Sequence, residues 1–131
     1  MEPNLKDFTD MHDQFLLDWN EAMHSGDTSS LERMAEDYYV AFFHNGAAKP
    51  MIFNRKEAIQ GMKQSVQQHS GAKKKFHNRV IRLKEHGHTV VFYEQTLEKE
   101  GMILARLFTI ENWQLIDGEW LLVRETEEPV S

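Results

Sequence analysis

The chain has 131 residues, a formal net charge of −6 and no cysteine. This length suits one domain spanning 1–131. The absence of thiols excludes disulfides, cysteine nucleophiles and cysteine-based zinc sites, and the acidic balance disfavours nucleic acid and anionic membranes as partners. Acidic residues interrupt the first stretch of the chain, and no apolar run approaches the roughly 20 residues of a membrane span, so we expect a cytoplasmic protein.

Three helices are expected before residue 70. Apolar residues recur at three- and four-residue steps over 5–24, which predicts an amphipathic helix ended by Gly26. The polar residues that follow offer N-caps for a short second helix over 28–36. A third helix is expected over 54–69, where Asn54 and Glu57 resemble a capping box.

A strand rich in aromatic and β-branched residues is expected over 38–44, followed by a loop from Asn45 to Pro50. Strand alternation would place Tyr38 and His44 on the same face. From residue 76 onward the apolar residues alternate with polar ones, which predicts a four-stranded antiparallel meander. The predicted class is therefore α+β, with three N-terminal helices packed on a curved antiparallel sheet and the meander at the C-terminus.

The turns set the expected strand registers. Asp117-Gly118 is typical of a two-residue type I′ turn, His86-Gly87 is expected to form a second tight turn, and 99–101 a three-residue loop. A two-residue loop at the last of these would reverse the faces. The pairs expected are Trp113 with Leu122, Glu111 with Arg124, Ile81 with Phe92, Arg79 with Glu94, Phe92 with Phe108, and Glu94 with Arg106.

The element order and three local signatures carry a family resemblance. The signatures are AMHSGD at 22–27 before Leu31, the aromatic strand at 38–43, and NW leading to DGEW at 112–120. With these features the chain resembles the nuclear transport factor 2-like superfamily, which includes polyketide cyclase-like and ketosteroid isomerase-like proteins and many uncharacterised bacterial ones. The resemblance implies a cystatin-like α+β cone with an apolar pocket and a dimer through the outer sheet face. Isomerase-like relatives pair an acidic base with a Tyr donor, and dehydratase-like ones use a His and Asp couple, but neither set is assigned to positions of this chain.

With the expected registers, one sheet face collects Phe92 and Phe108 beside a row of Arg79, Glu94 and Arg106. The row has two arginines and one glutamate, so one arginine is left to bind a carboxylate-bearing ligand. These residues are therefore candidate ligand contacts. The alternative is a solvated ladder of charges at the sheet margin.

His44 and Tyr38 are candidate catalytic and ligand-binding residues, with Glu94 as a further candidate for moving a proton. The alternative is a solvated histidine at a strand end and a tyrosine that buries its ring. His86 and His88 lack converging partners, so no metal site is expected. The basic run 73–75 is expected to be a solvated connection. The chain has no phosphate loop, dinucleotide fingerprint or nucleophile elbow, and no cofactor is expected.

Three functions remain open. The first is a small-molecule-binding protein with an apolar cone-shaped pocket. The second is a cofactor-independent lyase or isomerase in which Glu94 or His44 moves a proton while Tyr38 or an arginine stabilises the oxyanion. The third is a dimerisation module without a ligand. A homodimer is expected because the reverse sheet face is also apolar. That face would carry Val80, Val91, Tyr93, Leu107, Trp113, Leu115, Trp120 and Leu122.

Overall fold

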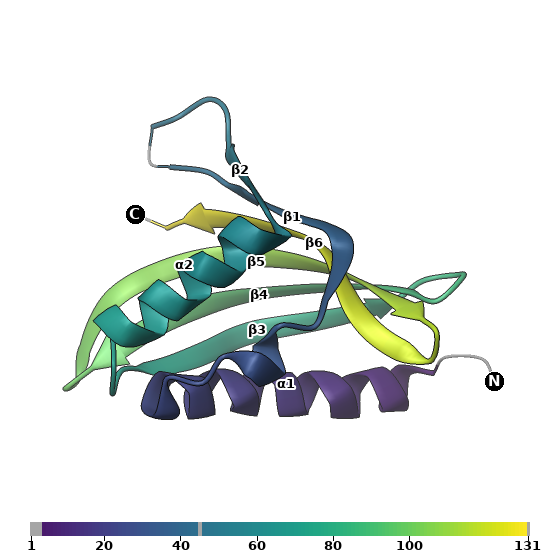
Figure 1. The fold of residues 1–131 in the computed structure, drawn as a ribbon, viewed down its shortest axis with the longest axis horizontal. Coiled ribbons are helices and arrows are strands. Elements are labelled where there is room, and N and C mark those ends of the chain that lie inside the picture. Colours follow the sequence, from purple (N-terminus) through teal and green to yellow (C-terminus); the bar gives the residue numbers. More distant parts are fainter. Residues whose placement is uncertain (1–3, 45, 131) are drawn as a thin grey trace.

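The computed structural model describes residues 4–44 and 46–130, which fold into an α+β arrangement around one curved sheet (Figure 1). In chain order the elements are α1 (Leu5–Ser25), a 3-10 turn (Ser29–Leu31), β1 (Met34–Phe42), β2 (Met51–Asn54), α2 (Arg55–Gln68), β3 (Lys73–Leu83), β4 (His88–Lys99), β5 (Met102–Ile116) and β6 (Glu119–Pro129). The strands lie in the order β2-β1-β6-β5-β4-β3. Asn45, the first residue of the expected loop, lies outside the described residues.

Local signals in the sequence place both ends of α1. The Asn4 side chain accepts a hydrogen bond from the Asp7 backbone N–H at 2.8 Å, which satisfies one of the free donors of the first turn. Gly26 adopts a left-handed conformation with φ of 80°, and its N–H donates to the Ala22 carbonyl at 2.8 Å. The helix expected over 5–24 is therefore confirmed, and Gly26 ends it as predicted.

The expected capping box at the start of α2 is confirmed. The Asn54 side chain accepts from the Glu57 N–H at 2.9 Å, and the Glu57 carboxylate accepts from the Asn54 N–H at 3.0 Å. No helix within 4–44 or 46–130 is long and apolar enough to cross a membrane.

Both helices pack on the same face of the sheet. Figure 1 shows α1 running beside β3, while α2 lies against β1 and β2. The core lies between the helices and the strands that they cover. Its fully buried large side chains include Phe8, Met23, Leu31, Tyr93, Trp113 and Leu122.

The second predicted helix, over 28–36, is wrong. Only Ser29–Leu31 form a helical turn, and β1 already begins at Met34. Met34 and Ala35 are buried, whereas Glu36 and Asp37 are exposed. Pairing with β6, at the far end of the chain, accounts for this outcome, because β1 buries its apolar residues in the sheet core instead of on a helix face.

The predicted sheet is incomplete in two respects. The short strand β2 was not expected, and it extends the sheet to six strands by pairing antiparallel with β1. β1 itself pairs parallel with β6, so the sheet is mixed rather than antiparallel throughout. β1 also ends at Phe42, so His44 lies beyond the strand that was expected to carry it.

The expected register between β3 and β4 is wrong by one residue. The loop has three residues, with positive φ at both His86 and Gly87, and Lys84 bonds to His88 across it. Ile81 therefore lies opposite Val91 instead of Phe92. A one-residue slip exchanges the faces of a strand, so Ile81 turns toward the core.

The pairing of β4 with β5 differs from the expected one by two residues. The loop is the two-residue form, with Glu100 and Gly101 at positive φ. A bulge near Leu97 adds a second one-residue shift, so each residue of β5 beyond it shares a face with the same residues of β4 as expected. Glu94 consequently lies opposite Phe108, and Phe92 lies opposite Ile110.

The Asp117-Gly118 turn is confirmed, with φ of 51° and 81° at its two residues. Trp113 pairs with Leu122 as predicted. A bulge then shifts the register, and Glu111 lies opposite Glu125, not Arg124.

The assignment of the two sheet faces was reversed for β4, β5 and β6, whereas Val80 on β3 lies on the outer face as expected. Val91, Tyr93, Trp113 and Leu122, which were expected on the outer face, are fully buried beneath the helices. The outer face instead carries exposed apolar side chains, which we call the outer apolar patch. It consists of Val80, Phe92, Phe108 and Ile110, exposed by 49%, 38%, 41% and 39%.

Candidate functional site

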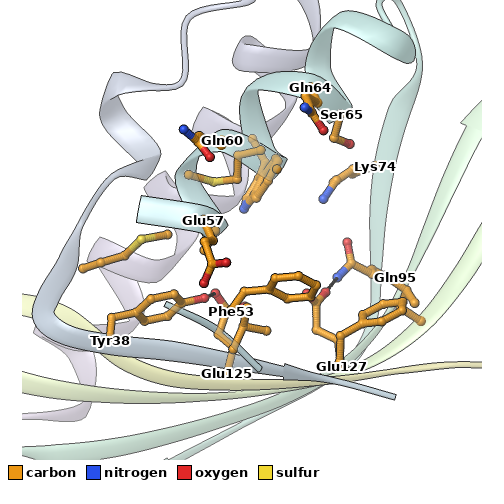
Figure 2. Close-up of a pocket in the computed structure, with 18 of the residues that line it drawn as sticks. Tyr38, Phe53, Glu57, Gln60, Gln64, Ser65, Lys74, Gln95, Glu125 and Glu127 are labelled. Atoms are coloured by element: carbon orange, nitrogen blue, oxygen red, sulfur yellow. Dashed lines mark hydrogen bonds between the residues drawn. The ribbon is translucent and has the colours of Figure 1, made fainter. Parts of the chain in front are cut away.

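A pocket of about 600 Å³ lies between α2 and the helix-covered face of the sheet (Figure 2). This volume is within the range of small-molecule sites. Its apolar and aromatic walls are Trp19, Met34, Tyr38, Val40, Phe42, Phe53, Ala58, Met62, Tyr93 and Leu107. Its polar residues are Glu57, Gln60, Gln64, Ser65, Lys74, Gln95, Glu125 and Glu127.

Two carboxyl groups from β6 meet at the floor of this pocket. Glu125 and Glu127 are two residues apart on one strand, so alternation turns both side chains to the same face. The Tyr38 hydroxyl donates a hydrogen bond to Glu125 Oε1 at 2.7 Å. Gln95 Nε2 lies 3.3 Å from Glu127 Oε2, a long hydrogen bond. These two acids and their donors come from three strands, β1, β4 and β6.

The environment favours the protonated form of this carboxyl pair. Burial raises the pKa of Glu125 well above its ordinary value, and the charges of Glu127 and Glu111 raise it further, while the Tyr38 hydrogen bond and Lys74 act in the opposite direction. Burial also raises the pKa of Glu127, which Lys74 lowers in part. The pKa of the Tyr38 phenol is raised by burial and by Glu125, so its hydroxyl remains a donor.

Lys74 is the basic group of the pocket wall. Its Nζ lies 3.5 Å from the centre of the Trp19 ring, a cation–π arrangement. Asn20 holds its backbone through hydrogen bonds of 2.9 Å to the N–H and 3.0 Å to the carbonyl. Burial lowers the pKa of Lys74, although the nearby glutamates raise it in part.

A second polar cluster is buried beside the pocket. The Glu111 carboxyl accepts hydrogen bonds from His12 Nε2 at 2.7 Å and Trp113 Nε1 at 2.9 Å on one oxygen, and from the Tyr93 hydroxyl at 2.6 Å on the other. Arg79 Nη1 lies 3.0 Å from His12 Nδ1. A guanidinium can only donate, so this network assigns the proton of the neutral imidazole to Nε2. Donors therefore occupy both oxygens of Glu111, which is not among the residues that line the pocket.

The structure places the predicted site residues in three regions. Tyr38 lines the pocket. Phe92 and Phe108 stack on the outer face with ring centres 6.2 Å apart and border a groove of about 230 Å³ there. His44 is exposed near the end of β1, with its ring centre 5.1 Å from that of Phe42.

The expected row of Arg79, Glu94 and Arg106 is not formed. Glu94 and Arg106 make a partly exposed ion pair of 3.5 Å. Arg79 points instead to α1, where its Nη2 donates to Asp13 at 2.7 Å. The bulge in β3 next to Arg79 separates it from the other two residues.

Four charged residues of the pocket were missed as site residues by the sequence reasoning: Glu125, Glu127, Lys74 and Glu57, the last of which was expected only as a helix cap. Glu125 and Glu127 lie in the charged run after the last apolar residues of β6, where alternation alone shows that they share a face. Lys74 lies in the basic run 73–75, expected to be solvated. Its neighbours Lys73 and Lys75 are exposed, whereas strand alternation turns Lys74 inward.

Within the described parts of the chain, no group of three or more His, Asp or Glu side chains has a geometry that could hold a metal ion.

A family model described as the SnoaL-like domain matches residues 13–124. The chain belongs to this SnoaL-like family, within the nuclear transport factor 2-like superfamily. No curated protein matches the chain. The family assignment confirms the resemblance found in the sequence.

Three solved structures with the same fold are distant in sequence from this SnoaL-like protein. A cystatin-like protein of unknown function from Nostoc punctiforme has a TM-score of 0.74 at 17% identity, with 99% of this chain and 96% of that chain covered. A nuclear transport factor 2-like protein from Novosphingobium aromaticivorans has a TM-score of 0.75 at 12% identity, covering 97% and 84%. Another from Cytophaga hutchinsonii has a TM-score of 0.67 at 17% identity, covering 98% and 100%. At these identities the similarity establishes the fold alone.

Proposed function

We propose that the protein binds a small organic molecule in the pocket between α2 and the sheet. The observation that carries this proposal is a cavity of about 600 Å³ with aromatic and apolar walls, on which eight polar side chains converge. Small-molecule sites share this combination, because apolar surface supplies affinity while a few polar groups fix orientation. A module that serves only for dimerisation would be expected to fill such a concavity with its own side chains.

Gly61 offers a direct test of this proposal. It lies on α2 at the rim of the pocket, and a Cβ added there would meet no atom within 4 Å. Gly61→Phe should therefore fold and obstruct the pocket, whereas Gly61→Ala should leave it open. Calorimetric titration with an aromatic alcohol such as 4-phenylbutan-1-ol should show binding to the wild type and to Gly61→Ala, and at least about tenfold weaker binding to Gly61→Phe. Equal affinities for all three proteins would refute the proposal.

A second candidate function is proton transfer in the same pocket, as in a cofactor-independent isomerase or lyase. The contact between the Tyr38 hydroxyl and Glu125 favours it, since it combines a phenol donor with a carboxyl whose pKa burial has raised. Neither Glu94 nor His44 lines this pocket, so Glu125 takes the place of the proton carrier expected from the sequence. The test is deuterium uptake from D₂O into the α-carbon of a bound aryl ketone, followed by NMR. Glu125→Gln should abolish uptake while the ketone still binds, and uptake unchanged in this variant would exclude the role.

We also propose that two copies of the chain associate through the outer apolar patch. Both helices cover the opposite face of the sheet, and the patch brings four exposed apolar side chains together on neighbouring strands. A two-fold dimer would remove this surface from water in both copies. The patch replaces the set expected from the sequence, most of which is buried in the core.

A further inference from the structure

The charged residues around the pocket are unequal in number. Glu57 stands at the rim on α2 and Glu125 and Glu127 on the floor, whereas Lys74 is the basic residue among those that line the pocket. Glu57 is held in place by the capping box of α2. With its acids ionised, the pocket therefore has an excess of two negative charges.

The two floor carboxyls also have unused hydrogen-bond acceptors. Tyr38 bonds one oxygen of Glu125, and Gln95 makes a long bond to one oxygen of Glu127. Among residues 4–44 and 46–130, the second oxygen of each carboxyl accepts no hydrogen bond, and neither carboxyl forms an ion pair within 4.0 Å. Glu111 is different, since donors occupy both of its oxygens. The floor of the pocket is thus short of donors.

We infer that the pocket selects an organic cation, a protonated primary or secondary amine on an apolar or aromatic body, with the ammonium group bound between Glu125 and Glu127. This inference rests on the proposed function and names its ligand class. Ammonium N–H groups supply the donors that the two free oxygens lack, and charge-assisted bonds of this kind are stronger than neutral ones. The rings of Tyr38, Phe53 and Tyr93 also line the pocket, and aromatic side chains are suited to the neighbourhood of a cation.

An anionic ligand fits the same pocket less well. Its negative group would have to approach Lys74, whose Nζ already lies over the Trp19 ring. It would also lie beside the two floor carboxyls, and like charges in a partly buried site repel strongly. A cation has the opposite effect, because it relieves the repulsion between Glu125 and Glu127, which adds to burial in raising the pKa of Glu125.

Three ligands with one apolar body test the charge preference: 4-phenylbutylamine, 4-phenylbutan-1-ol and 4-phenylbutanoate, titrated into the full chain at pH 8 by calorimetry. We expect the amine to bind about tenfold tighter than the alcohol, and the carboxylate to bind weakest. If the alcohol or the carboxylate binds at least as tightly as the amine, the inference is overturned while the proposed function stands. If none of the three binds, both are overturned.

Two matched variants on β6 test whether the preference for the amine comes from the floor carboxyls. Glu127→Gln removes one floor charge, and Glu128→Gln removes the same charge from the next residue, which faces the outer side beside Phe108. Glu127→Gln should reduce the preference for the amine over the alcohol about tenfold, whereas Glu128→Gln should leave it within about twofold. An unchanged preference in Glu127→Gln, or equal losses in the two variants, would overturn the inference.

The affinity for the amine should also depend on pH. The titratable groups that face the floor carboxyls are Tyr38 on β1, Glu57 on α2, Lys74 on β3, Tyr93 on β4 and, behind Tyr93, Glu111 on β5. Because the pKa of both floor carboxyls is raised, ammonium binding should release a proton, and the amine should bind at least about threefold tighter at pH 8 than at pH 6. The alcohol should bind equally at both. Amine affinity that falls with rising pH would contradict the role of these carboxyls.

Discussion

Replacement of Glu111 by alanine should be among the most destabilising single changes in this protein. The three side chains that donate to Glu111, namely His12, Tyr93 and Trp113, are exposed by only 0%, 2% and 0%. They come from α1, β4 and β5, so the carboxyl joins the helix to two strands at the centre of the core. In the alanine variant all three donors would remain buried without an acceptor.

The magnitude follows from the number of donors. A buried polar group without a partner costs about 1–3 kcal/mol, so three orphaned donors should lower the free energy of unfolding by about 3 kcal/mol or more. Glu111→Gln is the matched control. One Glu111 oxygen receives both His12 and Trp113, and the amide oxygen of glutamine can keep these two bonds. The control should therefore lose only about 1 kcal/mol, mainly through its altered contact with Tyr93.

Urea unfolding, followed by tryptophan fluorescence, measures both values. Tyr93→Phe should then destabilise the wild type by about 1 kcal/mol but have little effect in the Glu111→Ala background, since the hydroxyl has already lost its acceptor there. A loss below about 1 kcal/mol for Glu111→Ala, or additive effects in the double variant, would refute the reasoning.

Further outcomes are expected from single variants. Trp113→Ala should lower the free energy of unfolding by about 3 kcal/mol, because its ring is fully buried, and urea titration measures this loss. Gly118→Val should lower the melting temperature more than Glu119→Val, since Gly118 has φ of 81°; equal values would contradict the turn. Glu125→Gln should raise the melting temperature at pH 8 by about 3 °C but leave it unchanged below pH 4.5, because a raised carboxyl pKa gives stability that is lost as pH rises through the folded-state value. Light scattering should show a wild-type dimer of 15.4 kDa chains and a Phe92→Glu monomer, whereas a monomeric wild type would exclude the dimer.

The elements that the sequence predicted well depend on local interactions. The end of α1 at Gly26, the capping box at Asn54 and the turn at Asp117-Gly118 each involve residues within a few positions of one another. The segment over 28–36 could not be predicted in this way. Met34 pairs with Leu122, which lies near the other end of the chain, and this long-range pairing overrides the weak local preference for a helix.

The face that forms the pocket could not be deduced from alternation. The pattern shows which residues of a strand share a face, but both faces of this sheet carry apolar residues, so it does not show which face the helices cover. Bulges in three strand pairs then change the partners further along, and the register slip at His86 turns Ile81 to the core. The candidate site therefore lies at Glu125 and Glu127 on β6, and not at Arg79 and Glu94, where the predicted registers had placed it.

Two groups of acidic residues in the same sheet differ in whether the fold alone accounts for them. Glu111 is buried with donors on both oxygens, so its place in the core is explained by the fold alone. Glu125 and Glu127 lie close enough to raise the pKa of Glu125, and both pKa values are raised by burial, which makes the empty fold less stable once these acids ionise. Each also keeps an acceptor oxygen free toward the cavity. Natural proteins retain such destabilising arrangements mainly at functional sites. A ligand that donates hydrogen bonds would therefore stabilise the protein most at Glu125 and Glu127. It would pair with the carboxyl oxygens that have no donor in the protein.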